Sequence, residues 1–436
     1  MRRTALDAKS TGANVEHTNP SERLEKPLHT LRMGCGVAAG LICMLLLACP
    51  PAAWMSAQAQ THATGKKKVE RKGAPPKAGA KEQEERPAFT AQDDDAAAIP
   101  GIADARIWGD SESAFARVLP QVSGPWLAIS GGGSDGAYGA GVLTGWSEAG
   151  TRPQFAVVSG VSIGALIAPF AFLGPRYDEE LHKNFTSIGA ADIFEDRMTR
   201  SSLFDYWPLK RLIEHRVTPT LLSEIAAEHA RGRRLWVATT NLDAGRRVIW
   251  NMGAIAAHGE QGARLFRDIL LASSAIPGFF SPVPIEVEAN GKKFQELHGD
   301  GTLTAPFFVM PETMFSARST SRPPLGQLYV MVNSKLGPEF KMPDHNIPGV
   351  LGRSIGVALT AALRAELMLI YVGAQRQGIA LRVAHVDPSF DFPSRGPFDG
   401  KYMQALYEVG VAAGKKGTAF GDTVPELSMR GSSSQQ

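Results

Sequence analysis

From Trp126 onward, short apolar runs alternate with longer stretches that read as helices. The short runs indicate buried strands, which we expect at 126–130, 155–159, 235–240, 328–332 and 381–386. We expect helices at 137–148, 163–173, 219–230, 260–272, 351–377 and 400–413. This strand–helix alternation predicts an α/β fold with a central, mostly parallel sheet and helices on both faces.

The first sixty residues follow a different pattern. Residues 34–49 form a compact apolar run, and no Lys, Arg, Asp or Glu lies between Met33 and Gly65. A membrane-spanning helix needs about 20 apolar residues, so this run is short for a span. With Arg32 beside it, the run fits the apolar core of a secretory signal with a long polar start, and we predict an export signal over 1–59. A buried core helix is the alternative, but the residues that follow cannot pack around it.

Two processing sites compete within this signal. The sequence Leu46-Leu47-Ala48-Cys49 resembles a bacterial lipobox, in which Cys49 would be lipidated and would anchor the mature protein. Residues 57–59, Ala-Gln-Ala, fit ordinary cleavage, and a retained signal anchor or a start nearer Met33 is also open. Each processing outcome places the body outside the cytoplasm. We therefore expect export in a Gram-negative-type bacterium, to the periplasm or to an envelope membrane.

Residues 60–98 are charged, rich in Pro, Ala and Gly, and nearly free of large apolar side chains. Such a segment buries too little apolar surface to offset the entropy lost on ordering, so we expect a disordered linker. Its basic run at 66–68 could contact anionic lipid head groups, although a solvated charge run is the simpler interpretation. We expect residues 426–436 to form a frayed tail.

Composition adds a few limits. The chain has 436 residues, 44% of them hydrophobic, and its formal net charge of +3 gives no reason to expect a nucleic-acid partner. All three cysteines, Cys35, Cys43 and Cys49, lie in the first fifty residues. The body therefore has neither a disulfide framework nor a cysteine metal site.

The most informative motif is Gly160-Val161-Ser162-Ile163-Gly164, which follows a predicted strand and opens a predicted helix. This is the context of a nucleophile elbow, where Gly160 and Gly164 permit a tight turn that raises Ser162 above the sheet edge. The positive end of the helix dipole then faces the serine oxygen. For this motif alone, a glycine-rich turn with an incidental serine is an equal alternative.

A second glycine motif, at 131–136, reads GGGSDG and also lies between a predicted strand and a predicted helix. Backbone N–H groups of consecutive glycines can converge on one negative oxygen, so this loop could form an oxyanion hole. The same residues satisfy the G-x-G-x-x-G pattern of dinucleotide sites. In a dinucleotide fold the next strand carries an acidic residue near its end, whereas here residues 157–160 read VVSG. The oxyanion hole is therefore the favoured interpretation.

A serine hydroxyl needs a base to become a good nucleophile. Asp300 lies in HGDGT at 298–302, where the flanking glycines suggest a bend that presents the carboxylate at a strand end. A surface Asp-Gly turn is the alternative. Two of the ten histidines, His298 and His385, lie close to predicted strands, but neither has a motif around it.

Together these motifs resemble the patatin-like phospholipase family, in its bacterial branch. GGGSDG resembles the family's glycine-rich oxyanion loop, GVSIG its nucleophile elbow, and DGT at 300–302 its catalytic-aspartate motif D-G-[GA]. The segment ASSAIPGFFSP at 272–282 resembles a family segment that precedes this aspartate. The match covers about residues 125–317, in the family's order and approximate spacing.

The resemblance implies a three-layer α/β sandwich and hydrolysis of lipid acyl esters by a Ser–Asp dyad, with no cofactor and no metal. Ser162 would be the nucleophile and Asp300 the proton acceptor. The oxyanion loop would comprise Gly131, Gly132, Gly133 and Ser134. We expect a catalytic domain at 125–317 and, at 318–425, a continuation packed on the same α/β domain.

Two residues depart from the family pattern. Asp135 stands where many members carry Arg or Lys, and facing the reacting carbonyl it would oppose the negative charge that forms there. We therefore expect the Asp135 side chain to point away. Thr302 replaces the usual Gly or Ala, and its β-branch restricts the turn after Asp300.

The implied partner is a lipid or ester substrate, with a membrane surface as a further possibility. Seven aromatic residues could line an acyl-chain pocket or face lipid, although core packing explains most of them: Phe185, Phe194, Phe204, Tyr206, Trp207, Phe279 and Phe280. Two rival interpretations stay open. One is an α/β-hydrolase esterase with a histidine triad, pairing Ser162 with His385, and the other is a non-catalytic, lipid-binding envelope lipoprotein.

Overall fold

The computed structural model describes residues 86–199, 201–316 and 323–422. The predictions for the export signal at 1–59, including Cys49, for linker residues 60–85 and for the tail at 426–436 lie outside these residues.

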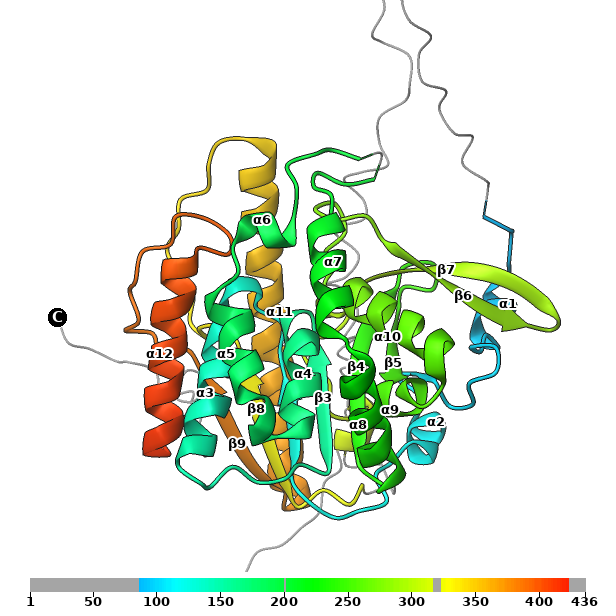
Figure 1. The fold of residues 1–436 in the computed structure, drawn as a ribbon, viewed down its shortest axis with the longest axis horizontal. Coiled ribbons are helices and arrows are strands. Elements are labelled where there is room, and N and C mark those ends of the chain that lie inside the picture. Colours follow the sequence, from blue (N-terminus) through cyan, green and yellow to red (C-terminus); the bar gives the residue numbers. More distant parts are fainter. Residues whose placement is uncertain (1–85, 200, 317–322, 423–436) are drawn as a thin grey trace, which may run out of the picture. The chain divides into compact units, whose positions relative to one another are not determined.

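The described residues form one nine-stranded mixed sheet, whose main path runs β1-β5-β4-β3-β2-β8-β9 (Figure 1). The strands are β1 (Arg106–Trp108), β2 (Trp126–Ile129), β3 (Val157–Val161), β4 (Arg234–Asn241), β5 (Arg246–Asn251), β6 (Val283–Ala289), β7 (Lys292–Asp300), β8 (Gln327–Val332) and β9 (Ala380–His385). Strands β4, β3, β2, β8 and β9 are parallel. The other four join in antiparallel pairs, with β7 paired to both β4 and β6.

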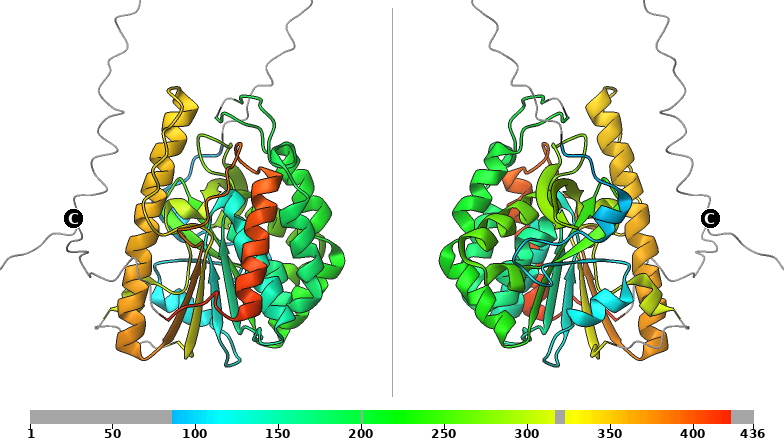
Figure 2. Two further views of the ribbon diagram at one scale, coloured as in Figure 1. Left: turned by 90° about the vertical axis from the view of Figure 1, so that its left-hand side faces the viewer. Right: turned by 90° about the vertical axis from the view of Figure 1, so that its right-hand side faces the viewer.

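Helices cover both faces of this sheet, which Figure 2 shows nearly edge-on. One face carries α3 (Gly136–Glu148), α4 (Ile163–Leu173), α5 (Asp178–Thr186), α6 (Ala190–Ile193), α7 (Trp207–Arg216), α8 (Pro219–Ala230), α9 (Met252–Ala256), α10 (Gly259–Ser273) and α12 (Gly400–Lys416). The other face carries α2 (Glu112–Arg117) and the long helix α11 (Ile347–Gln377). A short helix, α1 (Ala91–Asp95), precedes the first strand.

Alternation along the strands divides the core in two. In β2, Leu127 and Ile129 pack under the larger helix layer, while Trp126 and Ala128 pack toward α2 and α11. Because both faces are covered, the central strands are buried throughout and read as continuous apolar runs. The predicted α/β fold, with a mostly parallel sheet and helices on both faces, is confirmed.

The antiparallel strands β1, β5, β6 and β7 were not among the strands predicted from the sequence. The β6–β7 hairpin turns at Asn290 and Gly291, both at positive φ, and β6 alternates buried and exposed positions. Asn-Gly between two alternating runs is a strong hairpin signal. A search for continuous apolar runs passes over it, because a half-exposed antiparallel strand does not need an unbroken apolar sequence.

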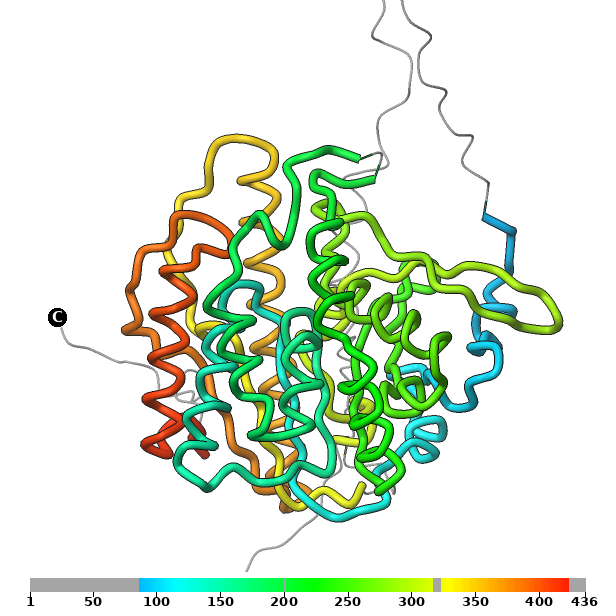
Figure 3. The backbone as a smooth tube through the Cα atoms, viewed as in Figure 1, coloured from blue at the N-terminus to red at the C-terminus, as the bar shows by residue number. Residues whose placement is uncertain are grey.

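The predicted linker also extends too far into the domain. Residues 86–98 pack against the β6–β7 hairpin, beside which the blue segment runs in Figure 3. Phe89 stacks on Phe294, with ring centroids 4.4 Å apart, and Ala98 bridges to Glu288. A few specific contacts thus order a segment that composition alone predicts to be disordered.

Candidate active site

The turn after β3 holds Ser162 in a strained backbone conformation. Ser162 has φ 56° and ψ −125°, between the end of β3 at Val161 and the start of α4 at Ile163. A Cβ at Gly160 would lie 2.3 Å from the carbonyl oxygen of Gly164, so only glycine fits there. Non-glycine residues at positive φ cost about 1–3 kcal/mol and cluster at functional sites. The local sequence therefore builds the sharp strand-to-helix turn that raises the serine.

Strand β7 brings Asp300 to the same place. Strand β3 ends where Val161 pairs with Ala238 of β4, but β4 continues for three more residues. Along these residues β7 takes the place that β3 has left, and Asp300 pairs with Thr239. Residues 161 and 300 thus face consecutive positions of one strand. This register explains why two residues far apart in sequence meet.

The two side chains are in direct contact. The Ser162 hydroxyl donates to Asp300 Oδ2 at 2.7 Å, and both side chains are buried. The other carboxylate oxygen, Oδ1, accepts from the Thr302 N–H at 2.9 Å and from the Thr302 hydroxyl at 2.7 Å. Burial raises the pKa of Asp300 to about 6, although the hydrogen bonds from Thr302 and Ser162 favour the ionised form.

A buried serine fixes the peptide of the turn. The Ser162 N–H donates to Ser273 Oγ at 3.0 Å, and the Ser273 hydroxyl donates to the carbonyl oxygen of Ala238 at 2.8 Å. Ser273 ends α10 and lies in the segment at 272–282 that the sequence analysis singled out, but its role was not predicted.

The glycine loop supplies backbone donors. The N–H of Gly131 donates to the carbonyl oxygen of Pro306 at 3.1 Å. This donor of the predicted oxyanion loop is therefore not available to an oxyanion. Within the described residues, the N–H groups of Gly132 and Gly133 have no hydrogen-bond acceptor. Both glycines line the same pocket as Ser162. Of the loop residues that line the pocket, Gly132 and Gly133 therefore carry the free donors.

Asn333 anchors this loop from the end of β8. Its N–H donates to Ser130 Oγ and its side-chain amide donates to the Ser130 carbonyl oxygen, both at 2.9 Å. A Cβ at Gly132 would lie 2.0 Å from the Asn333 carbonyl oxygen. Close backbone contact thus makes glycine obligatory at 132. A polar residue just past a buried strand was the available signal for Asn333, which was not predicted as a site residue.

The next two loop residues contact the segment at 398–402, where α12 begins. Ser134 Oγ accepts from the N–H of Phe398 at 2.7 Å, and Asp135 Oδ1 accepts from the Tyr402 hydroxyl at 2.8 Å. Burial raises the pKa of Asp135 to about 6. The Asp135 carboxylate bonds to α12 and does not line the Ser162 pocket.

A pocket of about 370 Å³ opens onto Ser162. Polar atoms of the loop and of Ser162 line its base, and its walls are mostly apolar: Ile163, Leu166, Ile193, Leu209, Ile276, Phe280, Leu359 and Leu363. Apolar walls with a few convergent polar groups suit a ligand with an apolar chain and one reactive polar centre. Across the described part of the chain, no group of three or more His, Cys, Asp or Glu side chains could hold a metal ion.

The two histidines of the sequence analysis lie elsewhere. His385 ends β9, which β2 and β8 separate from β3, so three strand spacings of about 4.8 Å place it about 14 Å away across the sheet. His298 is fully buried and contacts Thr239 Oγ1 and Glu296 Oε2, both at 2.9 Å. The hydroxyl of Ser162 bonds to a carboxylate and to neither histidine.

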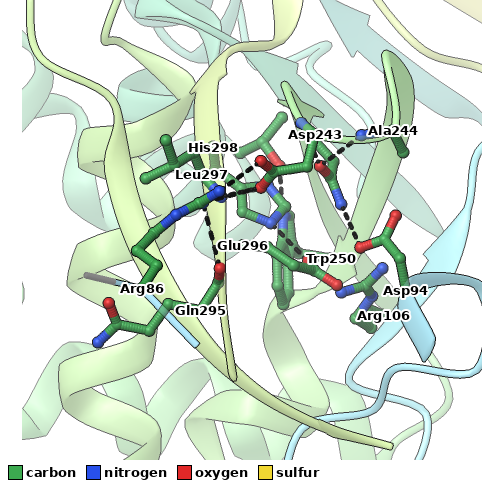
Figure 4. A network of polar contacts seen from close by, with 12 residues as sticks. Arg86, Asp94, Arg106, Asp243, Ala244, Trp250, Gln295, Glu296, Leu297 and His298 are labelled. Atoms are coloured by element: carbon green, nitrogen blue, oxygen red, sulfur yellow. Dashed lines mark hydrogen bonds and ion pairs between the residues drawn. The ribbon is translucent and has the colours of Figure 1, made fainter. Parts of the chain in front are cut away.

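Figure 4 shows the buried network around His298. Trp250 Nε1 donates to Thr239 Oγ1, and Arg106 pairs with Glu296. Burial lowers the pKa of His298, which favours neutral imidazole with Nε2–H donating to Glu296. Burial also raises the pKa of Glu296, but the bond from His298 and the charge of Arg106 outweigh it and bring that pKa to about 2. The network braces β7, the strand that ends at Asp300.

The aromatic residues predicted to line a pocket or face lipid have different surroundings. Phe185 is buried in the core, whereas Phe194, Phe204, Phe279 and Phe280 pack on one another with ring centroids 4.8–6.4 Å apart. Within this cluster, Phe280 lines the pocket. Trp207 is 46% exposed, and Arg211 lies over its ring.

Comparison with known proteins agrees with these motifs. Residues 127–311 match the family model described as Patatin-like phospholipase. No curated protein matches the chain significantly. Among solved structures, the crystal structure of VipD from Legionella pneumophila is similar, with 12% identity and a TM-score of 0.35 over 72% of this chain and 70% of that chain. A likeness this weak supports no inference about function, whereas the family match supports lipid acyl hydrolysis.

Proposed function

Because residues 127–311 match the Patatin-like phospholipase family model, we propose that this chain is a serine esterase that hydrolyses lipid acyl esters with a Ser162–Asp300 dyad. The observation that carries the proposal is the 2.7 Å hydrogen bond from the Ser162 hydroxyl to Asp300, at the base of an apolar pocket. This distance lies within the range for proton transfer between a nucleophile and its base.

In the acylation step, Ser162 Oγ attacks the ester carbonyl carbon while its proton passes to Asp300 Oδ2. The carbonyl oxygen becomes an oxyanion, which the N–H groups of Gly132 and Gly133 receive. The C–O bond to the alcohol then breaks, and the alcohol takes the proton from Asp300. Loss of one oxyanion donor typically costs about 2.7–4 kcal/mol of transition-state stabilisation.

Water completes the cycle by the same groups. Asp300 takes a proton from water, whose oxygen attacks the acyl carbon, and the proton returns to Ser162 as the fatty acid leaves. Burial supports this role, because a carboxylate with a pKa of about 6 is a stronger base than one near the reference value of about 3.9 and is still ionised at pH 7.

Thr302 acts as a positioning residue in this scheme. Its two bonds to Oδ1 fix the carboxylate so that Oδ2 faces Ser162. Its methyl group lies against the glycine loop, since a Cβ at Gly131 would come within 2.5 Å of Thr302 Cγ2. One side chain therefore contacts both the base and the loop that carries the oxyanion donors.

Labelling with a serine-directed fluorophosphonate tests the proposal. The full chain should be labelled, and the Ser162→Ala variant should not. Hydrolysis of p-nitrophenyl butyrate should disappear with the label. Well-folded protein that shows no label at Ser162 would contradict the dyad and favour the alternative of a lipid-binding module without catalysis.

We also propose that the chain is exported and that Cys49 anchors it to an envelope membrane. The apolar run at 34–49 with its lipobox-like end supports this. Fractionation of expressing cells tests it: the protein should sediment with membranes, and the Cys49→Ser variant should shift to the soluble periplasmic fraction. Recovery of the native chain in the cytoplasm would contradict export.

A further inference from the structure

The N-terminal half of α11 is apolar but has no core to pack against. None of residues 347–362 is buried, whereas the C-terminal half buries Leu363, Leu367 and Ile370. Arg353 is the single charged residue in this half. In Figure 2 this end of α11, drawn in yellow, extends beyond the sheet. The sheet therefore packs against only the C-terminal half of α11.

The two faces of this helical half have different surroundings. Gly356, Leu359, Thr360 and Leu363 recur at helical spacing and line the Ser162 pocket. The outer face of α11, on the opposite side, comprises Ile347, Val350, Ser354, Val357, Ala358 and Ala361. All six residues of the outer face are exposed, with Ile347 at 80% and Val357 at 51%. One helix thus forms a wall of the pocket and presents an apolar surface outward.

Neighbouring segments extend this apolar surface. Phe340 and Met342, just before α11, are 94% and 79% exposed. On the pocket side, a Cβ at Gly352 would lie 3.4 Å from the ring of Phe279, whose carbonyl oxygen accepts from the N–H of Phe204. The helix, the turn at 277–281 and the segment at 202–204 thus adjoin one another at the pocket.

The length of the exposed half of α11 indicates whether this helix could span a membrane or only contact its surface. The whole of α11 is long and apolar enough to cross a membrane, and only 17% of its most apolar window is buried. The C-terminal half of α11, however, packs on the sheet. The remaining 16 residues, 347–362, form a helix only about 24 Å long, which is less than the hydrocarbon thickness of about 30 Å. A shallow contact at the membrane interface fits this geometry, and a span does not.

We propose that the outer face of α11, with Phe340 and Met342, docks on a lipid surface with zwitterionic head groups. The inference rests on the proposed function, because the same helical half walls the pocket in which a lipid ester would be cut. Charge favours zwitterionic over anionic lipid, because the two basic residues of 336–362, Lys341 and Arg353, are balanced by Glu339 and Asp344, and the outer face itself carries no charge. Docking there would hold the wall of the pocket that this helix forms against the surface that contains its substrate.

Hydrogen exchange tests the docking directly. The full-length Ser162→Ala variant, which cannot consume lipid, is measured with and without phosphatidylcholine vesicles. Exchange in residues 336–362 should slow when vesicles are present, including at 0.5 M salt. Unchanged exchange there would overturn the proposal, even if the N-terminal apolar run carries the protein to the vesicles. Slow exchange already present without vesicles and dependent on protein concentration would overturn it in favour of a second copy of the chain.

A pair of variants separates docking from catalysis. The double variant Val350→Asp, Val357→Asp should lower hydrolysis of phosphatidylcholine vesicles at least tenfold and leave p-nitrophenyl butyrate hydrolysis unchanged. Val409→Asp on α12, an apolar residue 36% exposed on another helix, is the matched control and should leave both activities unchanged. Equal vesicle activity in the double variant and the control would overturn the proposal. The exchange measurement remains decisive even if the wild-type chain hydrolyses neither substrate.

Discussion

Thr302 holds one oxygen of the Asp300 carboxylate with two hydrogen bonds and leaves the other oxygen to Ser162. From the sequence, Thr302 was expected to restrict the turn after Asp300. The structure shows that this departure adds a hydroxyl donor, which Gly or Ala would lack.

Thr302→Val should therefore impair the base while preserving the packing against Gly131. A hydrogen bond to a charged group contributes about 1.5–3 kcal/mol, so kcat should fall by about 10- to 100-fold with little change in KM. Loss of a donor to the ionised carboxylate also raises its pKa, so the acid limb of the pH profile should move to higher pH. Thr302→Ser keeps the hydroxyl and should restore both kcat and the profile. Equal kcat values in the Val and Ser variants would show that the hydroxyl has no such role.

The activity of the wild-type chain should follow the ionisation of Asp300. Burial raises its pKa to about 6, and only the ionised form can accept the serine proton. The kcat/KM for p-nitrophenyl butyrate should rise about tenfold per pH unit below pH 6 and level off above it. A profile that stays flat down to pH 4.5 would contradict Asp300 as the base.

Asp300→Asn should lower the esterase activity and raise the free energy of unfolding at high pH. The folded-state pKa lies above the unfolded value, so the protonated form stabilises the fold below pH 4 and this contribution is lost as pH rises through 6. Asn stays neutral, and it should raise the free energy of unfolding by about 1–3 kcal/mol at pH 8, with little difference at pH 4. Esterase activity should fall by about 10³-fold. Urea denaturation at the two pH values measures the difference, and a variant less stable than wild type at pH 8 would contradict it.

Much of this site could be predicted from local sequence, because its parts are turns. The glycine spacing around Ser162 and at 131–136 specifies sharp turns at strand ends, and parallel strands bring such turns to one edge. The contact between Ser162 and Asp300 depends instead on register, since β7 succeeds β3 along β4. Nothing in the local sequence encodes that succession. Ser273 and Asn333 escaped notice for a similar reason, because their importance lies in backbone partners from distant strands.

The histidine variants distinguish the dyad from a triad. His385→Ala should leave p-nitrophenyl butyrate hydrolysis within about twofold of wild type, because general-base catalysis contributes 10²–10⁴-fold and this residue does not supply it. A loss as large as that of Ser162→Ala would establish a triad instead.

His298→Ala should act on stability. It removes the imidazole that bonds to Glu296 and Thr239, at an expected cost of about 3 kcal/mol in the free energy of unfolding, although Arg106 still pairs with Glu296 and Trp250 still donates to Thr239. Urea denaturation measures this loss. The folded fraction of the variant should retain fluorophosphonate labelling at Ser162, and its absence would mean that His298 takes part in catalysis.

Two glycine substitutions in one loop should differ sharply. A Cβ at Gly132 meets the Asn333 carbonyl oxygen at 2.0 Å, whereas a Cβ at Gly133 has no atom within 4 Å. Gly132→Ala should therefore lower the free energy of unfolding by about 3 kcal/mol and abolish activity as the loop shifts. Gly133→Ala, strained only by its φ of 57°, should cost about 1 kcal/mol and retain activity. Equal effects of the two substitutions in urea denaturation and ester hydrolysis would contradict the loop geometry.

The backbone at Ser162 has a consequence for how this fold can change. A φ of 56° is energetically unfavourable for serine, and a glycine at the same position would relieve this strain. Substitutions that increase the stability of the fold would therefore include replacement of Ser162 by glycine, which removes the hydroxyl on which the chemistry depends. Persistence of serine at this position among related chains would thus record selection for turnover, acting against the preference of the backbone.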